Sequence, residues 1–234
     1  MPGYFDTLRD EIEPLIPANP SITMDIGCGE GVTSRWLKQI RPNITTIGVE
    51  IDKSVAAIAA SVVDTVLVVD LDKGLEALAG YKGRVDLLLL LDVLEHLHDP
   101  WARLAEFKSL LAPSGIIIAS IPNVRNLKVL GPLLVRGEWR YQSSGILDRT
   151  HLRFFTRRTV VELFEGAGYE IQKMATTGPL QAGRIKSISG GAAFLANKML
   201  AGTLEDFVAH QYVVRAATAV TQGRTDGDTK NQPA

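Results

Sequence analysis

MDIGCGEG, residues 24–31, is the stretch that decides the fold, because an apolar run containing Asp25 leads into three glycines at alternate positions, Gly27, Gly29 and Gly31. Glycine lets the chain turn sharply and lets a ligand approach the main chain closely. Amide groups at the start of a helix attract negative charge. The stretch therefore predicts a strand, a tight turn and a helix that together bind a nucleotide-like ligand.

The spacing of the glycines separates two classes of nucleotide cofactor. A dinucleotide-binding turn reads G-x-G-x-x-G, whereas Val32 stands where the last glycine of that pattern would lie. A nicotinamide-dependent oxidoreductase or epimerase is therefore the weaker alternative, and the spacing favours a different cofactor.

Length and composition indicate one sizeable core. The chain has 234 residues, of which 46% are hydrophobic, and a formal net charge of -1. No apolar run approaches the roughly 20 residues that span a bilayer, and the first residues lack the pattern of a signal peptide. We expect a soluble, cytoplasmic protein with one domain over residues 1–222 and a disordered, polar tail over residues 223–234. A single cysteine, Cys28, excludes an internal disulfide.

Strand-like and helix-like segments alternate along the chain, which is typical of a parallel sheet covered by helices on both faces. Most predicted strands are uninterruptedly apolar, as expected when both faces of a sheet are buried. The fold class is therefore α/β. The predicted strands are 21–27, 45–51, 65–71, 85–92, 114–123, 169–177 and 207–220, and the predicted helices are 32–40, 54–62, 101–112 and 156–168.

Two long connections interrupt the alternation, at residues 124–150 and 178–204. Connections of this length are usually lids or binding loops. Ligands of open α/β sheets bind beyond the carboxyl ends of the strands, and the first connection leaves the fifth predicted strand from that end. We expect it to be a substrate cap.

A carboxylate or amide ends each of the first five predicted strands, and in a parallel sheet these side chains converge at one edge. Glu50 can accept hydrogen bonds from both hydroxyls of a ribose and lies about 20 residues past the glycine turn, as expected for that role. Asp70 can accept from an adenine amino group, and Asp25 can orient the glycine loop or meet a cationic amine. The set is completed by Asp92 and Asn123.

These stretches resemble the motifs of the class I S-adenosylmethionine-dependent methyltransferases, in the same order. MDIGCGEG resembles the first motif of that family, E/D-x-G-x-G-x-G. GVEID at 48–52 resembles the second motif and VVDLD at 68–72 the third. LLLLLDVLEHLHDP at 87–100 matches the segment that faces the methionine part of the cofactor, and LLAPSGIIIASIPN at 110–123 completes the pattern.

The resemblance implies a Rossmann-like sheet of seven strands in the order 3-2-1-4-5-7-6, mostly parallel with an antiparallel seventh strand, to which the predicted cap after the fifth strand is added. It implies S-adenosylmethionine as cofactor and S-adenosylhomocysteine as product. The implied cofactor-binding residues are Asp25, Gly27, Gly29, Gly31, Glu50, Ile51, Asp70, Leu71, Leu91 and Asp92.

Residues 145–170 resemble a narrower group of these enzymes, which is associated with bacterial glycan and O-antigen assembly. The implied acceptor is a sugar hydroxyl on a glycan, glycolipid or nucleotide-sugar. A second hint is the crowding of basic residues in the cap and the next helix, which favours an anionic acceptor unless the surface is simply solvated. Arg149 and Arg153 are the predicted contacts to that acceptor.

Three further side chains are predicted to contact the acceptor. Trp139 and Tyr141 would stack on a sugar ring, with packing of the cap onto its own domain as the alternative. Asn123, at the end of the fifth predicted strand, completes the set.

A hydroxyl acceptor must lose a proton, and histidine titrates near neutral pH. His151 is the predicted base, with a structural hydrogen bond that pins the cap as the alternative. His96 is the second candidate, with a role at the start of a helix as its alternative. Asp148 or Glu95 would orient a histidine or serve as the base instead. We expect no metal, because the carboxylates are assigned to the cofactor and no calcium-type loop is present.

Other functions stay open at this point. The acceptor can be another small molecule, or the chain can be a non-catalytic subunit that binds S-adenosylmethionine. We expect no nucleic-acid partner, because neither an N/D-P-P-Y-type motif nor a broadly basic composition is present.

Overall fold

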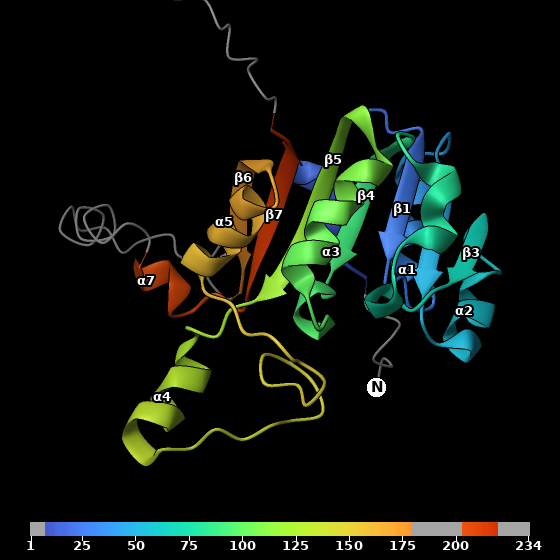
Figure 1. Ribbon diagram of the computed structural model, residues 1–234. Coiled ribbons are helices and arrows are strands. Elements are labelled where there is room, and N and C mark those ends of the chain that lie inside the picture. The colour runs from blue at the N-terminus through green and yellow to red at the C-terminus, as the bar shows by residue number, and fades with distance from the viewer. Residues whose placement is uncertain (1–7, 179–202, 220–234) are drawn as a thin grey trace, which may run out of the picture.

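The computed structural model describes residues 8–178 and 203–219 and contains one seven-stranded sheet (Figure 1). The strand order is β3-β2-β1-β4-β5-β7-β6, as the sequence predicts. Neighbours from β3 to β5 pair in parallel, whereas β7 is antiparallel to both β5 and β6. The strands are β1 Ile22–Ile26, β2 Thr45–Glu50, β3 Thr65–Val68, β4 Val85–Leu91, β5 Leu111–Pro122, β6 Tyr169–Thr177 and β7 Gln211–Thr218.

Helices and short 3-10 turns occupy the connections between the strands. The α-helices are α1 Val32–Ile40, α2 Lys53–Ala59, α3 Pro100–Phe107, α4 Leu127–Arg136, α5 Arg157–Gly166 and α7 Thr203–Asp206. The 3-10 turns are η1 Asp10–Leu15, η2 Leu71–Lys73, η3 Glu76–Tyr81, η4 Leu94–His96 and η5 Lys108–Leu110.

The central strand β4 is apolar at successive positions because both faces of the sheet are covered. Leu88 and Leu90 belong to the core cluster that includes residues of α3 and α5. Leu87 and Leu89 belong to a second cluster, which includes residues of η1 and α1. All four leucine side chains are fully buried. Burial on both faces of the sheet therefore explains the uninterrupted apolar run of this strand, as predicted.

Three strands differ from the sequence prediction by three or more residues at one end. The fifth strand begins at Leu111 rather than at residue 114, because Leu111 pairs with Val85 of β4 across an irregularity in the register. The third strand ends at Val68 rather than at residue 71, because the Asp70 side chain accepts from the Asp72 amide at 3.2 Å and begins η2. The seventh strand begins at Gln211 rather than at residue 207, because the chain turns after α7, where the amides of Val208 and Ala209 donate to the Glu205 carbonyl at 3.1 and 2.8 Å.

The connection after β5 is inserted at the carboxyl edge of the sheet, where α4 projects away from the body of the domain (Figure 1). The Asn126 side chain caps α4 by accepting from the Lys128 amide, and Gly137 ends the helix in a left-handed conformation. Of the second predicted lid, residues 179–202 lie outside the described residues, as does the predicted tail at 223–234.

Among the described residues, no helix combines the length and the apolar composition that crossing a bilayer requires.

Candidate active site

The glycine turn between β1 and α1 has the conformation that its sequence predicts. Gly27, Gly29 and Gly31 have φ angles of 67°, 54° and 79°, in the left-handed region that favours glycine. A Cβ atom on Gly31 would lie 2.7 Å from Cγ2 of Val63. Helix α1 starts at Val32, and no side chain among the described residues caps its first turn. The turn therefore leaves backbone close to any ligand bound there, which fits a nucleotide-like cofactor.

Glu50 ties the glycine turn to the end of β2. One carboxylate oxygen accepts from the Gly29 amide at 3.0 Å, and the other accepts from the amides of Ile51 and Asp52 at 2.8 and 3.0 Å. A carboxylate has about four acceptor positions, so one remains for a ribose hydroxyl. The Ile51 side chain is 62% exposed, as expected of a residue that would cover an adenine ring.

Asp25 lies under the turn and is buried. Its carboxylate accepts from the Ser34 hydroxyl on α1 at 2.9 Å. Burial raises the pKa of Asp25 to about 7, although the hydrogen bond from Ser34 opposes this shift. The contact joins β1 to α1, which favours the loop-orienting role over contact with a cationic amine.

Two predicted cofactor-binding residues, Asp70 and Leu71, lie just past the end of β3. Asp70 is part-buried, caps η2 and forms an ion pair with Lys73 at 3.0 Å. Leu71 is partly buried against the core. Both lie on the same edge of the sheet as the glycine turn.

Asp92, just past the end of β4, has a positive φ of 57° and an ion-pair partner that the sequence analysis missed. Its carboxylate pairs with Arg9 and accepts from Nε2 of Gln211 at 2.5 Å. Burial raises the pKa of Asp92, and the charge of Arg9 opposes this shift. No local pattern could have linked these residues, because Arg9 precedes Asp92 by 83 positions. Leu91 precedes Asp92 in β4 and is partly buried.

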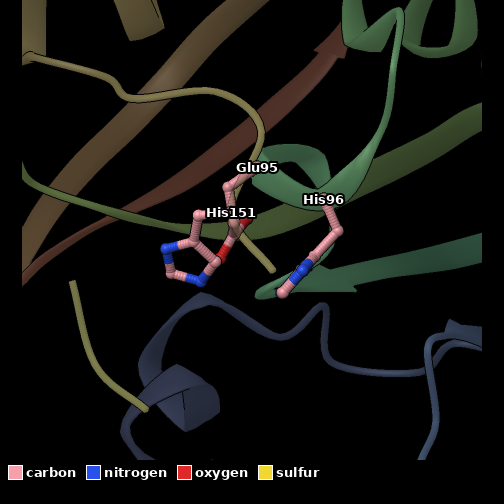
Figure 2. Close-up of side chains that lie close together, drawn as sticks. All are labelled: Glu95, His96 and His151. Atoms are coloured by element: carbon pink, nitrogen blue, oxygen red, sulfur yellow. The ribbon is translucent and has the colours of Figure 1, made fainter. Parts of the chain in front are cut away.

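Glu95, His96 and His151 form a cluster beside the end of β4 (Figure 2). One potential metal-ligating atom from each residue lies within 4.8 Å of the others. The rings of His96 and His151 meet edge to face, with centroids 4.8 Å apart. Nε2 of His151 lies 4.0 Å from a Glu95 carboxylate oxygen. The structure thus brings together the two histidines predicted to be catalytic and Glu95, which the sequence analysis names as a residue that orients a histidine or serves as the base.

Backbone contacts hold this cluster together across the fold. The amides of Leu152 and Arg153 donate to the Glu95 carbonyl at 2.8 and 3.0 Å. Nδ1 of His96 lies 3.2 Å from the Thr150 carbonyl. The returning arm of the cap is therefore fastened to η4, which brings His151 beside Glu95.

Asp148, predicted as a catalytic candidate, organises the turn before His151. Its carboxylate accepts from the amide and the hydroxyl of Thr150, at 2.8 and 2.7 Å, and its carbonyl accepts from the His151 amide at 3.0 Å. Burial raises the pKa of Asp148, but the hydrogen bonds from Thr150 outweigh burial and the net shift is downward. This geometry fits a positioning residue rather than a proton acceptor.

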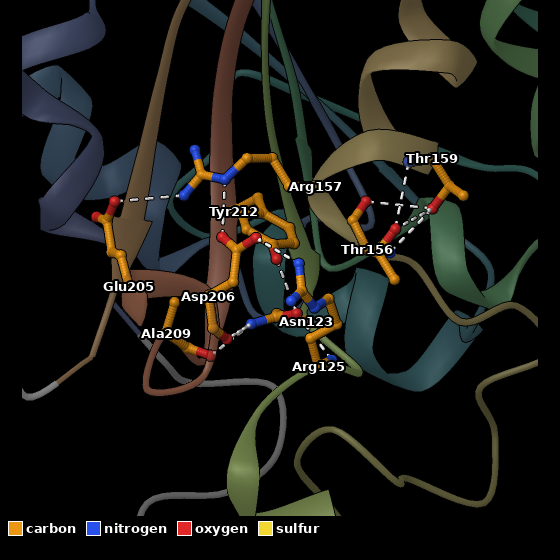
Figure 3. A network of polar contacts seen from close by, with 9 residues as sticks. All are labelled: Asn123, Arg125, Thr156, Arg157, Thr159, Glu205, Asp206, Ala209 and Tyr212. Carbon is orange, nitrogen blue, oxygen red and sulfur yellow. Dashed lines mark hydrogen bonds and ion pairs between the residues drawn. The ribbon is translucent and has the colours of Figure 1, made fainter. Parts of the chain in front are cut away.

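Asn123 does not fit the predicted role in substrate binding. Its side chain is fully buried, and its amide donates to the carbonyls of Asp206 and Ala209 at 2.5 and 2.9 Å (Figure 3). Its carbonyl oxygen accepts from the Tyr212 hydroxyl at 2.8 Å and from the Arg125 amide at 2.9 Å. Because these contacts use its polar atoms, Asn123 ties β5 to the segment before β7.

Several basic residues of the predicted acceptor patch are also occupied by structural contacts. Arg125 and Arg157 form ion pairs with the buried Asp206, at 3.3 and 2.7 Å (Figure 3). Arg136 and Arg140 pair with Glu138 at 3.3 and 3.0 Å. Because these arginines are paired with acidic side chains, fewer positive charges are available to a ligand than the number of basic residues in the sequence indicates.

The two arginines singled out from the sequence differ in their surroundings. The Arg153 guanidinium donates to the His98 carbonyl and lies 6.0 Å from the centre of the Trp101 ring. The Arg149 side chain is exposed and has no hydrogen bond or ion pair to another described side chain. Arg149 is therefore the better placed of the two to contact an acceptor.

The predicted stacking residues pack within the cap. Trp139 meets Phe154 edge to face with ring centroids 5.2 Å apart, and the Tyr141 ring lies 6.4 Å from the same phenylalanine. Trp139 is partly buried, whereas Tyr141 is 54% exposed. Trp139 therefore has a packing role within the cap, which was the alternative to stacking on a sugar ring. Tyr141 remains exposed enough to contact a ligand.

Comparison with known proteins gives the family. Residues 3–174 match the family model described as a methyltransferase domain, and this chain belongs to that family. A curated relative, the ubiquinone biosynthesis O-methyltransferase of Cereibacter sphaeroides (strain ATCC 17029 / ATH 2.4.9), is 31% identical over 166 residues. The match covers 69% of this chain and 65% of the relative, so it spans less than two thirds of the relative's length.

Solved structures confirm the fold. A SAM-dependent methyltransferase from Archaeoglobus fulgidus superposes with a TM-score of 0.60 at 20% identity, over 88% of this chain and 89% of that one. The [4+2]-cyclase SpnF superposes with a TM-score of 0.61 at 18% identity, over 90% of this chain and 79% of that one. The family match shows that this chain carries a methyltransferase domain, and these structures show that it has their fold. The predicted link to glycan assembly finds no support in these relatives.

Proposed function

We propose that this chain is an O-methyltransferase that activates an acceptor hydroxyl beside Glu95, His96 and His151. The observation that carries the proposal is the position of this cluster, directly after the end of β4. That strand ends at Leu91 and is followed by Asp92. The resemblance to the S-adenosylmethionine-dependent methyltransferases predicts that both residues face the methionine part of S-adenosylmethionine, the proposed cofactor. An acceptor at the cluster would therefore lie next to the methyl group.

The reaction makes two demands on the chain. The acceptor oxygen forms a bond to the methyl carbon as the bond from carbon to sulfur breaks, and the electron pair of that bond returns the sulfonium to a neutral thioether. Much of this in-line displacement can be catalysed by alignment alone. The hydroxyl proton must also leave, and a positioned acid–base group contributes about 10²- to 10⁴-fold to such a step.

The cluster meets the second demand. Burial raises the pKa of Glu95 well above its usual range, and the charge of Asp92 adds to this shift. Burial also lowers the pKa of His96, with a smaller contribution from the neighbouring His151. Perturbed groups gathered at a ligand-binding edge are typical of catalytic sites.

The acceptor is a ring hydroxyl in either of two classes. The name of the Cereibacter relative favours an intermediate of ubiquinone biosynthesis. The resemblance of residues 145–170 to enzymes of glycan assembly, together with the exposed Arg149, favours an anionic sugar. The exposed face of Tyr141 suits a planar ring or a sugar ring.

The test is methyl transfer from isotopically labelled S-adenosylmethionine by the purified full chain, with phenolic and quinol acceptors in one panel and nucleotide-sugars in another. We expect label in one panel only, attached to oxygen by mass spectrometry. Label on nitrogen would contradict O-methylation. No label in either panel, with S-adenosylhomocysteine still bound, would favour the non-catalytic subunit. The fold alone does not require methyl transfer, because SpnF has this fold and is described as a [4+2]-cyclase.

A further inference from the structure

The buried carboxylate of Glu95 is the starting point, because neither of its oxygens has a hydrogen-bond partner among the described residues. The side chain is 1% exposed. Buried polar groups are almost always hydrogen-bonded, and an exception requires an explanation such as a catalytic role or a bound ion. Nε2 of His151 lies 4.0 Å from one of these oxygens, which is too far for a hydrogen bond.

Each histidine of the cluster has its Nδ1 beside a backbone carbonyl, and Nε2 of His151 lies 4.0 Å from the Glu95 carboxylate. Nδ1 of His96 lies 3.2 Å from the Thr150 carbonyl, and Nδ1 of His151 lies 3.0 Å from the Ile146 carbonyl. A carbonyl oxygen only accepts, so each Nδ1 carries the hydrogen and each Nε2 has a free lone pair. Metal-bound histidines show this arrangement, in which a backbone carbonyl holds the second ring nitrogen and fixes the orientation of the ring.

We propose that Glu95, His96 and His151 bind a divalent transition-metal cation, with a fourth position open to the acceptor hydroxyl. The proposal replaces the sequence expectation of a metal-independent site. Binding of the cation stands by itself, whereas its part in the reaction rests on the proposed O-methyltransferase function.

The distances suit this assignment with a small adjustment. Ligand atoms about 2.1 Å from a tetrahedral cation lie roughly 3.4 Å from one another. The three atoms of the cluster lie within 4.8 Å of one another, so they must close by little more than about 1 Å. Terminal torsions of the glutamate and histidine side chains can provide such a movement.

The donor set selects the kind of cation. Two imidazole nitrogens and one carboxylate oxygen suit zinc and its neighbours in the first transition row, whereas magnesium and calcium favour oxygen ligands alone. Three protein ligands and one open position are the pattern of catalytic rather than structural zinc sites. A cation here would lower the pKa of a bound hydroxyl, so that its proton leaves more readily. His151 would then act as a ligand rather than as the base.

Metal binding to the purified full chain, without an affinity tag and after treatment with a chelator, tests the proposal. Isothermal titration with Zn²⁺ should show one tight site, and Co²⁺ should give visible absorption bands of a site that contains nitrogen ligands. Glu95→Gln and His151→Ala should each weaken binding at least about 100-fold. His96→Gln provides a third variant, since His96 is only partly buried and its replacement is better tolerated by the fold.

The matched control is His98→Ala, which removes an exposed imidazole two positions from the cluster. Its Nδ1 pairs with Asp72 at 2.7 Å, away from Glu95. We expect wild-type Zn²⁺ affinity in this variant, and binding of S-adenosylhomocysteine in every variant reports that the chain is folded.

The proposal is overturned if the wild-type chain has no Zn²⁺ site, or if the Glu95 and His151 variants bind Zn²⁺ as the wild type does. Methyl transfer by the chelator-treated chain separates this failure from failure of the proposed function. Full transfer without metal would refute a catalytic role for the cation and leave the O-methyltransferase in place. If the wild type binds Zn²⁺, the Glu95 and His151 variants do not, and no acceptor is methylated, the result would support the metal site and contradict the proposed function.

Discussion

The two halves of the sheet's carboxyl edge, one at β1 and β2 and one at β4, differ in how their buried glutamates are hydrogen-bonded. At the β1–β2 half, the carboxylate of Glu50 accepts from three backbone amides that lie in the glycine turn or directly after the strand. At the β4 half, both oxygens of Glu95 lack a partner among the described residues. The contact that closes this second half joins His96 to Thr150, 54 positions apart.

This difference suggests separate roles: the β1–β2 half binds the cofactor, and the β4 half carries the groups that act on the acceptor. The first half is satisfied internally, so it presents a preformed backbone surface to a cofactor. The second half keeps a buried carboxylate without compensation, which destabilises the fold unless a ligand or ion completes the site. Strain and unpaired polar groups of this kind collect at functional sites and cost stability.

The largest expected effect is on the second half. His151→Ala should lower the rate of methyl transfer about 10²- to 10⁴-fold, because the variant loses either the base or a metal ligand. Binding of S-adenosylhomocysteine, measured by calorimetry, should not change, since His151 belongs to the acceptor side. Undiminished turnover would show that His151 takes no part in the mechanism. Loss of cofactor binding would show that the two halves do not act separately in binding and in chemistry.

A pH effect on stability should come from the first half. The folded-state pKa of Asp25, about 7, lies above the ordinary value of 3.8, so the folded chain holds a proton there that the unfolded chain releases. Its contribution to the free energy of unfolding therefore falls as pH rises from about 4 to about 7, by about 4 kcal/mol in total. Urea denaturation at several pH values should show a loss about 4 kcal/mol larger in the wild type than in Asp25→Asn, because the raised pKa values of Asp92 and Glu95 act in both chains. Parallel profiles of the two chains would contradict the assignment.

Gly31→Ala tests whether the first half depends on backbone shape. The substitution puts a Cβ atom 2.7 Å from Val63 Cγ2 and 2.9 Å from Val62 Cγ2, at a φ of 79°. We expect a loss of about 1–3 kcal/mol in stability and roughly tenfold weaker binding of S-adenosylhomocysteine, about 1.4 kcal/mol. Gly80→Ala is the control, because a Cβ atom there meets nothing within 4 Å. Equal behaviour of the two variants would show that the turn tolerates a side chain.

The smallest effect is expected at the rim of the second half. Arg149→Gln should raise the KM for an anionic acceptor about fivefold, the value of roughly one charge-assisted contact at an exposed site. Arg158→Gln, which alters an exposed arginine paired with Glu162 at 2.8 Å on α5, is the matched control. An unchanged KM for the Arg149 variant would reject this contact.

The first half could be predicted from the sequence because its determinants are local. Three glycines with positive φ and a glutamate at the end of the next strand form a pattern within about 25 residues. The order of the sheet came from resemblance to a family, and the structure confirms it.

The second half depends on contacts that no local pattern contains. Asn123 has the residue type and the strand-end position of a ligand-binding amide, yet the chain before β7 folds back and uses its polar atoms. Arg9 reaches Asp92 across 83 positions. The sequence offers Glu95 only as an alternative to the histidines, because its burial and the return of the cap, which places it beside His151, depend on contacts distant in sequence.

Thermal unfolding of the purified chain with S-adenosylhomocysteine and, separately, with NADH tests the central claim most directly. A ligand that binds only the folded state at about 100 times its Kd adds roughly 2.7 kcal/mol, which raises the Tm of a domain this size by several degrees. We predict that S-adenosylhomocysteine raises the Tm and that NADH does not. A rise in Tm with NADH alone would contradict this prediction and would indicate that the glycine turn binds a dinucleotide.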